Sequence, residues 1–256
     1  MKRLVAAFIL IQAVIASFQL VCGSAPLSAA ERVTLTAGNW DEYVPEGKEV
    51  DSIYGDIVLR NDKIEAVIGR PVAGRNANMT VRNVGGAVID LTKRNSSNDQ
   101  LSAYFPAAGA YAFRELPADE GKAMAATLRD DSVTFSCQAE ATENKPAVKL
   151  TYELKDGAPF LHLTTVYSNP HDQDIKFELL DSVRADRSFD FGTEKATGIF
   201  WAHDNWWRQA FGLLAEDAAI SFVGETLKRK RPILKYVVKE DGVLTLKPNE
   251  SISTGN

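Results

Sequence analysis

The sequence predicts an all-β fold, in which antiparallel strands pack as a two-layer β-sandwich. Short runs of alternating apolar and polar residues recur along the chain, and turn-forming residues separate them. The periodicity of an amphipathic helix is almost absent after Ala30. Because no helices of about 10–15 residues stand between the strand-like runs, consecutive strands are expected to pair antiparallel.

Residues 1–30 have the pattern of a secretory signal peptide. Lys2 and Arg3 give the chain a positive start, an apolar run follows over residues 4–21, and residues 28–30 are the small residues of a cleavage site. The alternative is a membrane anchor, because the apolar run is nearly long enough to cross a bilayer. The small-residue site and the missing basic flank favour cleavage. We therefore expect a secreted or periplasmic protein that has no membrane contact after the signal is removed.

The clearest strands form two hairpins. Residues 57–60 and 64–69 flank an Asn-Asp turn. Residues 148–155 alternate with a period of two, residues 156–159 (DGAP) reverse the chain, and residues 160–168 return beside them. The apolar side chains of the second hairpin that should point into the sandwich are Val148, Leu150, Tyr152 and Leu154.

Further strands are expected over most of the remaining chain. They lie at residues 79–84, 87–91, 123–129, 133–141, 175–183, 198–201, 218–223, 233–238 and 243–246. Short helical turns are expected at 97–104 and 205–211. No repeat and no Pro/Gly/Ser linker divides residues 31–256, so one β-sandwich domain is expected. A strand begins at residue 251 just before the sequence ends, which suits a domain that is incomplete at its C-terminus.

Composition excludes some functions. The net charge of −5 argues against nucleic-acid binding, which needs a basic face. The basic run at residues 228–231 is expected to be a solvated loop. Cys137 is the one cysteine outside the signal peptide, so it has no disulfide partner and should be a small buried apolar residue. The three histidines show no metal-binding spacing, and we expect no metal and no cofactor.

The strongest functional signal is the segment 201–208, which holds three of the four tryptophans. Aromatic rings stack on the C–H faces of sugars, and neighbouring polar groups can hold sugar hydroxyls, so the segment predicts a carbohydrate site. The alternative is that the tryptophans close one end of the sandwich. The candidate ligand-binding residues are Trp201, His203, Asp204, Trp206, Trp207 and Arg208.

Two other polar groupings have a structural and a functional interpretation. Residues 75–99 are rich in Asn and Arg, which turn chemistry explains, with a polar ligand pocket as the alternative. A sugar-active enzyme would need an acid and a base at a defined separation. His203 with Asp204 or Asp181 could supply them, and Asp181 with Asp186 or Asp190 could flank a sugar. The sequence contains no nucleophile motif, so catalysis by this chain alone is not expected.

One hairpin carries a resemblance to a known family. Residues 152–161 (YELKDGAPFL), followed by residues 164–169, resemble the central hairpin of galactose-mutarotase-like β-supersandwich domains. This resemblance implies a supersandwich fold and a carbohydrate-binding or accessory role. Mutarotase-type or glycosidase-type activity is the catalytic alternative that it implies.

A second resemblance involves residues 54–64, 76–90 and 98–101. They are similar to the N-terminal β region of secreted bacterial proteins of planctomycete type, in which it precedes a PHP-type metallohydrolase domain of the carbaryl-hydrolase-like (CehA/McbA-like) family. The resemblance covers most of residues 40–253 and ends before any metal-binding domain. It implies an accessory sandwich, with a missing C-terminal hydrolase domain as its partner. No catalytic residue follows from it.

Overall fold

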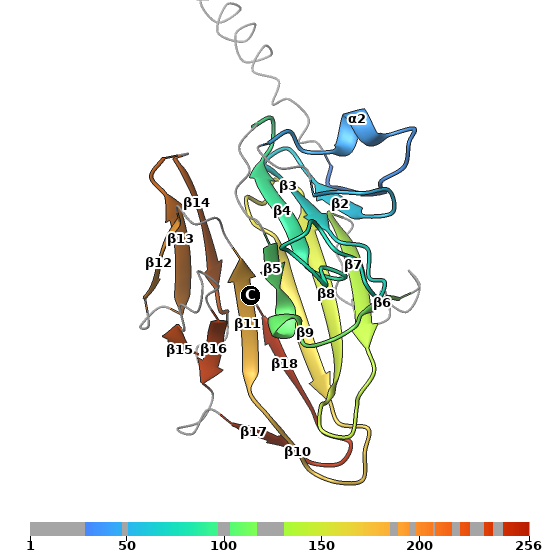
Figure 1. The fold of residues 1–256 in the computed structure, drawn as a ribbon, viewed down its shortest axis with the longest axis vertical. Helices are drawn as coiled ribbons and strands as arrows, with labels where there is room; N and C mark the ends of the chain where they lie inside the picture. Colours follow the sequence, from blue (N-terminus) through green and yellow to red (C-terminus); the bar gives the residue numbers. More distant parts are fainter. Residues whose placement is uncertain are drawn as a thin grey trace, which may run out of the picture.

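The computed structural model describes residues 29–47, 51–96, 103–116, 131–184, 189–194, 198–206, 208–216, 221–225, 233–237 and 243–255. In these residues the chain folds almost entirely into antiparallel sheets, which confirms the predicted all-β fold (Figure 1). Several predictions lie outside the described residues. They are the signal peptide, the strand at 123–129, Asp186, Trp207 and the basic run 228–231.

Two sheets form the sandwich. In spatial order, the larger sheet contains β1 (Glu31–Thr34), β2 (Ile57–Arg60), β3 (Ile64–Ile68), β4 (Val88–Lys93), β5 (Ala103–Phe105), β11 (Leu179–Arg184), β16 (Ile233–Val237) and β15 (Ser221–Glu225). The second, five-stranded sheet of the sandwich contains β18 (Ser251–Gly255), β9 (His162–Ser168), β8 (Ala147–Lys155), β7 (Ser132–Ala139) and β6 (Arg114–Glu115).

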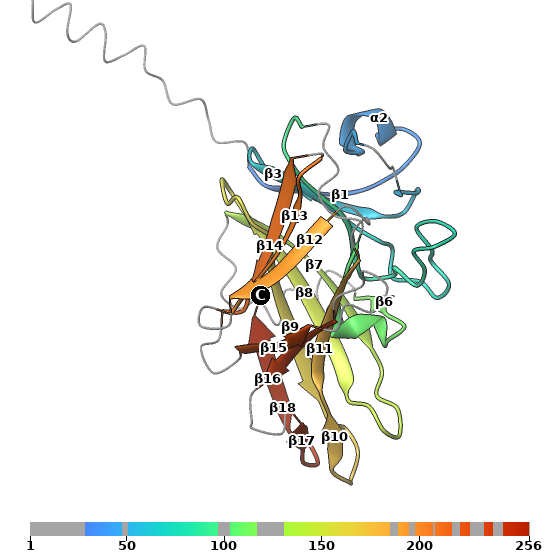
Figure 2. The ribbon, with the colours of Figure 1, turned by 60° about the vertical axis from the view of Figure 1, so that its left-hand side comes forward.

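A third sheet of three strands stands beside this sandwich, in orange tones in Figure 1. It consists of β12 (Phe189–Glu194), β13 (Ile199–Asp204) and β14 (Gln209–Leu214), and we call it the small sheet. Figure 2, in which the small sheet is turned forward, shows β13 and β14 passing in front of the sandwich. The remaining elements are the paired strands β10 (Ile175–Phe177) and β17 (Leu244–Leu246), the helix α2 (Trp40–Tyr43) and the 3₁₀ turn η1 (Pro106–Gly109).

Both predicted hairpins are confirmed. β2 pairs with β3, and the side chain of Asn61 shapes their turn by accepting hydrogen bonds from the backbone N–H groups of Lys63 (2.8 Å) and Ile64 (3.0 Å). β8 pairs with β9 around Gly157, which has the left-handed φ of 66° that the turn requires. These turns form because the residues that shape them lie next to the strands they join.

Three local predictions were wrong. Residues 79–84 form a loop, because the Asn78 side chain accepts from the N–H groups of Thr80 and Val81 and replaces a strand partner. The helical turn expected at 205–211 is wrong over residues 209–211, which begin strand β14 and pair with β13. Residues 103 and 104, expected at the end of the helical turn at 97–104, belong to strand β5.

The core lies between the two sandwich sheets. Val148, Leu150, Tyr152 and Leu154 are each at most 1% exposed, as predicted. Each such side chain contributes about 1.5–3 kcal/mol through the apolar area it removes from water. Cys137 is fully buried opposite Leu150 in the β7–β8 pair, which confirms its predicted role. The sandwich is therefore held by its apolar core.

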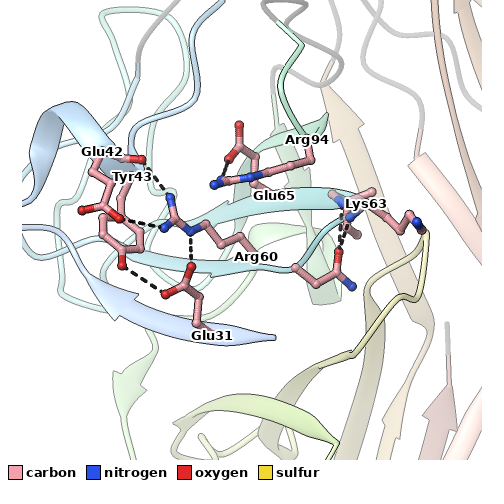
Figure 3. A network of polar contacts seen from close by, with 9 residues as sticks. Glu31, Glu42, Tyr43, Arg60, Lys63, Glu65 and Arg94 are labelled. Carbon is pink, nitrogen blue, oxygen red and sulfur yellow. Dashed lines mark hydrogen bonds and ion pairs between the residues drawn. The ribbon is translucent and has the colours of Figure 1, made fainter. Parts of the chain in front are cut away.

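The strands β2 and β3 are buried on both faces. Their second face carries a separate apolar cluster, covered by the loop of residues 70–87 and by α2. The buried Arg60 fastens α2 to this side (Figure 3). It donates to the Glu42 backbone oxygen (2.8 Å) and carboxylate (3.1 Å), contacts Glu31, and lies 3.6 Å from the centre of the Tyr43 ring.

The Asn- and Arg-rich region supplies residues 75–87 of this covering loop and the turn after β4, as the turn-chemistry interpretation predicted. Asn83 and Asn95 adopt the left-handed φ values of 57° and 58° that asparagine tolerates. Arg75 is buried and reaches Asp56, with Nη2 2.5 Å from Oδ2. Removing either partner of such a buried pair would leave an uncompensated charge, so these residues hold the loop on the sheet.

Candidate functional site

The small sheet presents a tryptophan on its outer face. Trp201 of β13 is 43% exposed, and His203 follows it on the same face. Both cross-strand partners of Trp201 are glycines, Gly192 of β12 and Gly212 of β14. A methyl group on Gly192 would meet the indole of Trp201 at 2.3 Å, so the indole occupies the space over that glycine. The residues of β13 that point inward are Phe200, Ala202 and Asp204.

The turn between β13 and β14 carries two more predicted site residues. Trp206 is 82% exposed, and its backbone N–H donates to Oδ1 of Asp204 over 2.8 Å. Arg208 is exposed and has a φ of 54°. Trp201 and Trp206 are therefore not plugs of the sandwich, and the aromatic side chains that pack inward from the small sheet are phenylalanines.

The structure separates His203 from the carboxylates suggested as its partners. Asp204 is fully buried on the opposite face of β13, where it shapes the turn. Asp181 is also buried, and it accepts hydrogen bonds from the Tyr104 hydroxyl (2.6 Å) and the Ala107 N–H (2.8 Å). Asp190 is exposed directly opposite His203 on the outer face. Of these carboxylates, Asp190 alone shares a face with His203.

A second polar group was missed by sequence reasoning. Nε2 of His162 lies 2.9 Å from Oε2 of Glu216, and its Nδ1 lies 3.8 Å from Oε2 of Glu153. His162 and Glu216 line a hollow of about 320 Å³ together with Thr164 and Ser253. The pairing of Glu153 with His162 follows from the DGAP hairpin and could have been found. Glu216 comes from beyond β14, and no local pattern points to it.

The chemistry available at these two places is hydrogen bonding, stacking and proton transfer. In the described part of the chain, no three His, Cys, Asp or Glu side chains gather closely enough to hold a metal ion. Among the same residues, no helix has the length and apolar character needed to span a bilayer.

Comparison with known proteins gives a fold and no activity. No protein-family model and no curated protein matches the chain. Its structure is similar to a solved TPR-domain containing protein from Parabacteroides distasonis, with a TM-score of 0.52 and 13% sequence identity. The similarity covers 78% of this chain and 46% of that protein, so this chain spans less than half of its length. At this identity the similarity shows a shared fold alone.

Proposed function

We propose that this chain is an exported, non-catalytic accessory module that binds carbohydrate on the outer face of the small sheet. The observation that carries the proposal is the exposed indole of Trp201, which lies across one glycine and has a second glycine beside it. An exposed aromatic ring that packs against a strand can offer a free face to the C–H face of a sugar ring. Such a ring needs little ordering on binding, which favours affinity.

Neighbouring polar side chains suit the hydroxyls that surround a stacked sugar. His203 is two residues from Trp201 on the same face, and Asp190 of β12 lies directly opposite His203. An imidazole and a carboxylate together can donate and accept hydrogen bonds. Trp206 and Arg208 extend from the turn at the end of the same hairpin. A short oligosaccharide along β13 would contact both groups of residues.

The test is binding of the full chain to a glycan array that includes galactosides, glucosides and uronic-acid polymers. The best-bound soluble oligosaccharide is then titrated by calorimetry. Trp201→Ala should weaken binding about tenfold or more, because aromatic anchors dominate such contacts. Gly192→Ala should weaken it as well, since the new methyl group displaces the indole.

The matched control is Tyr54→Ala, which removes a 58% exposed aromatic side chain that packs edge-on to Trp40, away from the small sheet. It should leave the affinity unchanged. The proposal fails if the array shows no binding, or if Trp201→Ala and Tyr54→Ala bind equally well.

A sugar-active enzyme is the second candidate, and one observation favours it. His162 lies between two glutamates at a solvent-accessible hollow, which provides an acid and a base within reach of one ligand. Reducing-sugar and mutarotation assays test this idea with His162→Asn and Glu216→Gln. Both variants should abolish any activity, while His171→Asn, at a half-buried histidine bonded to the Thr142 carbonyl, should retain it. Full activity in His162→Asn would exclude this site.

A further inference from the structure

The strand β14 has a free edge. Within the residues that the structure describes, it ends the small sheet and pairs with β13 alone. The N–H of Ala215 donates to the Gly198 carbonyl over 3.2 Å, which fixes the alternation of hydrogen-bonded pairs along β13 and β14. By that alternation, Gly212 and Leu214 point their backbone N–H and C=O groups away from β13. The backbone groups of these two residues therefore face the free edge.

An apolar cleft of about 390 Å³ runs beside this edge. Residues 211–214 of β14 line it consecutively, although their side chains alternate between faces, so the strand edge itself borders the cleft. In Figure 1, β14 is the strand of the small sheet that faces the sandwich. The opposite wall comes from sandwich residues, among them Val88, Tyr104, Leu163 and Val183.

The edge lacks the features that usually prevent strand pairing. The sequence of β14, QAFGLL, contains no charged residue and no proline. At the cleft, Leu214 and Phe160 are exposed by 51% and 58%. Exposed apolar side chains beside open backbone groups are typical of a surface that binds another chain.

We propose that the edge of β14 and the adjoining cleft bind an extended peptide segment of a partner protein, which adds a strand beside β14. Alternate apolar side chains of the segment enter the cleft, and its backbone bonds to Gly212 and Leu214. An apolar small molecule would fill the cleft but leave these backbone groups without partners, which costs free energy. The four bordering residues correspond to a segment of about four to six residues at roughly 3.3 Å each.

Charge at one end of the cleft selects the partner further. Glu216 lines the cleft just after the end of β14. A lysine or arginine at that end of the segment would face the Glu216 carboxylate, whereas an acidic residue would be repelled. The partner segment is therefore an alternating apolar strand that ends in a basic residue.

The probe is a fluorescein-labelled peptide, Val-Thr-Val-Thr-Val-Lys, titrated with the full chain and followed by fluorescence anisotropy. The control peptide carries N-methyl groups on alternate amides, which block strand pairing but keep the side chains. It should bind about tenfold or more weakly. A peptide ending in Glu should also bind more weakly, and Glu216→Gln should reduce the preference for Lys over Glu.

Two variants test the edge of β14. Leu214→Pro removes an N–H that points away from β13, and Leu214→Lys places a charge at the mouth of the cleft; both should weaken peptide binding about tenfold. The control is Ile53→Lys, which changes a 47% exposed apolar residue that does not line the cleft, and this variant should bind the peptide normally. Absence of binding at millimolar peptide, or equal binding of the N-methylated peptide, overturns the proposal. So does self-association that Leu214→Lys abolishes without any peptide binding.

Discussion

Two glycines with similar left-handed φ values allow the cost of one packing contact to be measured. Gly86 and Gly74 have left-handed φ values of 80° and 77°. Their surroundings differ. A methyl group on Gly86 would lie 2.9 Å from a ring carbon of Phe113 and 3.2 Å from the sulfur of Cys137, while one on Gly74 would meet no atom within 4 Å.

The expected magnitudes follow from that difference. Alanine at either position adopts an unfavourable left-handed conformation, which costs about 1–2 kcal/mol. Gly86→Ala also forces a methyl group against buried side chains, and overpacking of this kind costs roughly 1–3 kcal/mol more. We therefore expect a loss of about 1–2 kcal/mol for Gly74→Ala and about 2–5 kcal/mol for Gly86→Ala.

The assay is equilibrium urea unfolding followed by tryptophan fluorescence. The unfolding midpoints should fall in the order wild type, Gly74→Ala, Gly86→Ala, with equal slopes, because neither change alters the surface exposed on unfolding. Equal losses for the two variants would refute the reasoning, since the backbone cost alone would then explain both. A larger loss for Gly74→Ala would show that its loop makes contacts absent from this structure.

Three other measurements test the buried core and its surroundings. Burial raises the pKa of the Cys137 thiol well above its usual value, so a thiol reagent at neutral pH should react with Cys137 only as the protein unfolds. Tyr152→Phe removes the hydroxyl that donates to the Gly86 carbonyl over 2.5 Å, which should cost about 1–2 kcal/mol in urea unfolding. Burial raises the pKa of Tyr111 to about 12, above the usual tyrosine value of about 10, and the folded state therefore holds this proton more tightly. The stability that this raised pKa contributes should be complete below pH 10 and should disappear as the pH rises towards 12. In thermal melts, the melting temperature of Tyr111→Phe should therefore fall less over this alkaline range than that of the wild type.

The parts of the fold that the sequence predicted correctly are those decided by neighbours along the chain. The alternation of β8 and the turn at Gly157 bring β8 and β9 together with no help from distant residues. The predicted strand at 175–183 shows the opposite case. It divides into β10 and β11, because β10 pairs with β17 while β11 pairs with β5 and β16. Those partners are far away in sequence, and no local pattern contains them.

The candidate site divides in the same way. Alternation along β13 predicts that Trp201 and His203 share a face and that Asp204 does not. It does not predict which face is buried, because that depends on how the small sheet packs against the sandwich. The contact between His162 and Glu216 depends on the path of the chain after β14. Residue spacing contains no information on that path.

A substitution at Gly212 can test whether this glycine serves the proposed ligand or the stability of the fold. Glycine in a strand costs about 0.5–1 kcal/mol relative to alanine, and at Gly192 the indole of Trp201 explains it. At Gly212, an added methyl group would meet only the Phe200 carbonyl, at an ordinary 3.4 Å, and φ is not left-handed. The fold therefore gives this glycine no role, whereas a sugar stacked on Trp201 needs the space beside the ring. Gly212→Val should raise the urea midpoint and weaken glycan binding, and a variant that is stabilised yet binds normally would show that the sugar does not approach from β14.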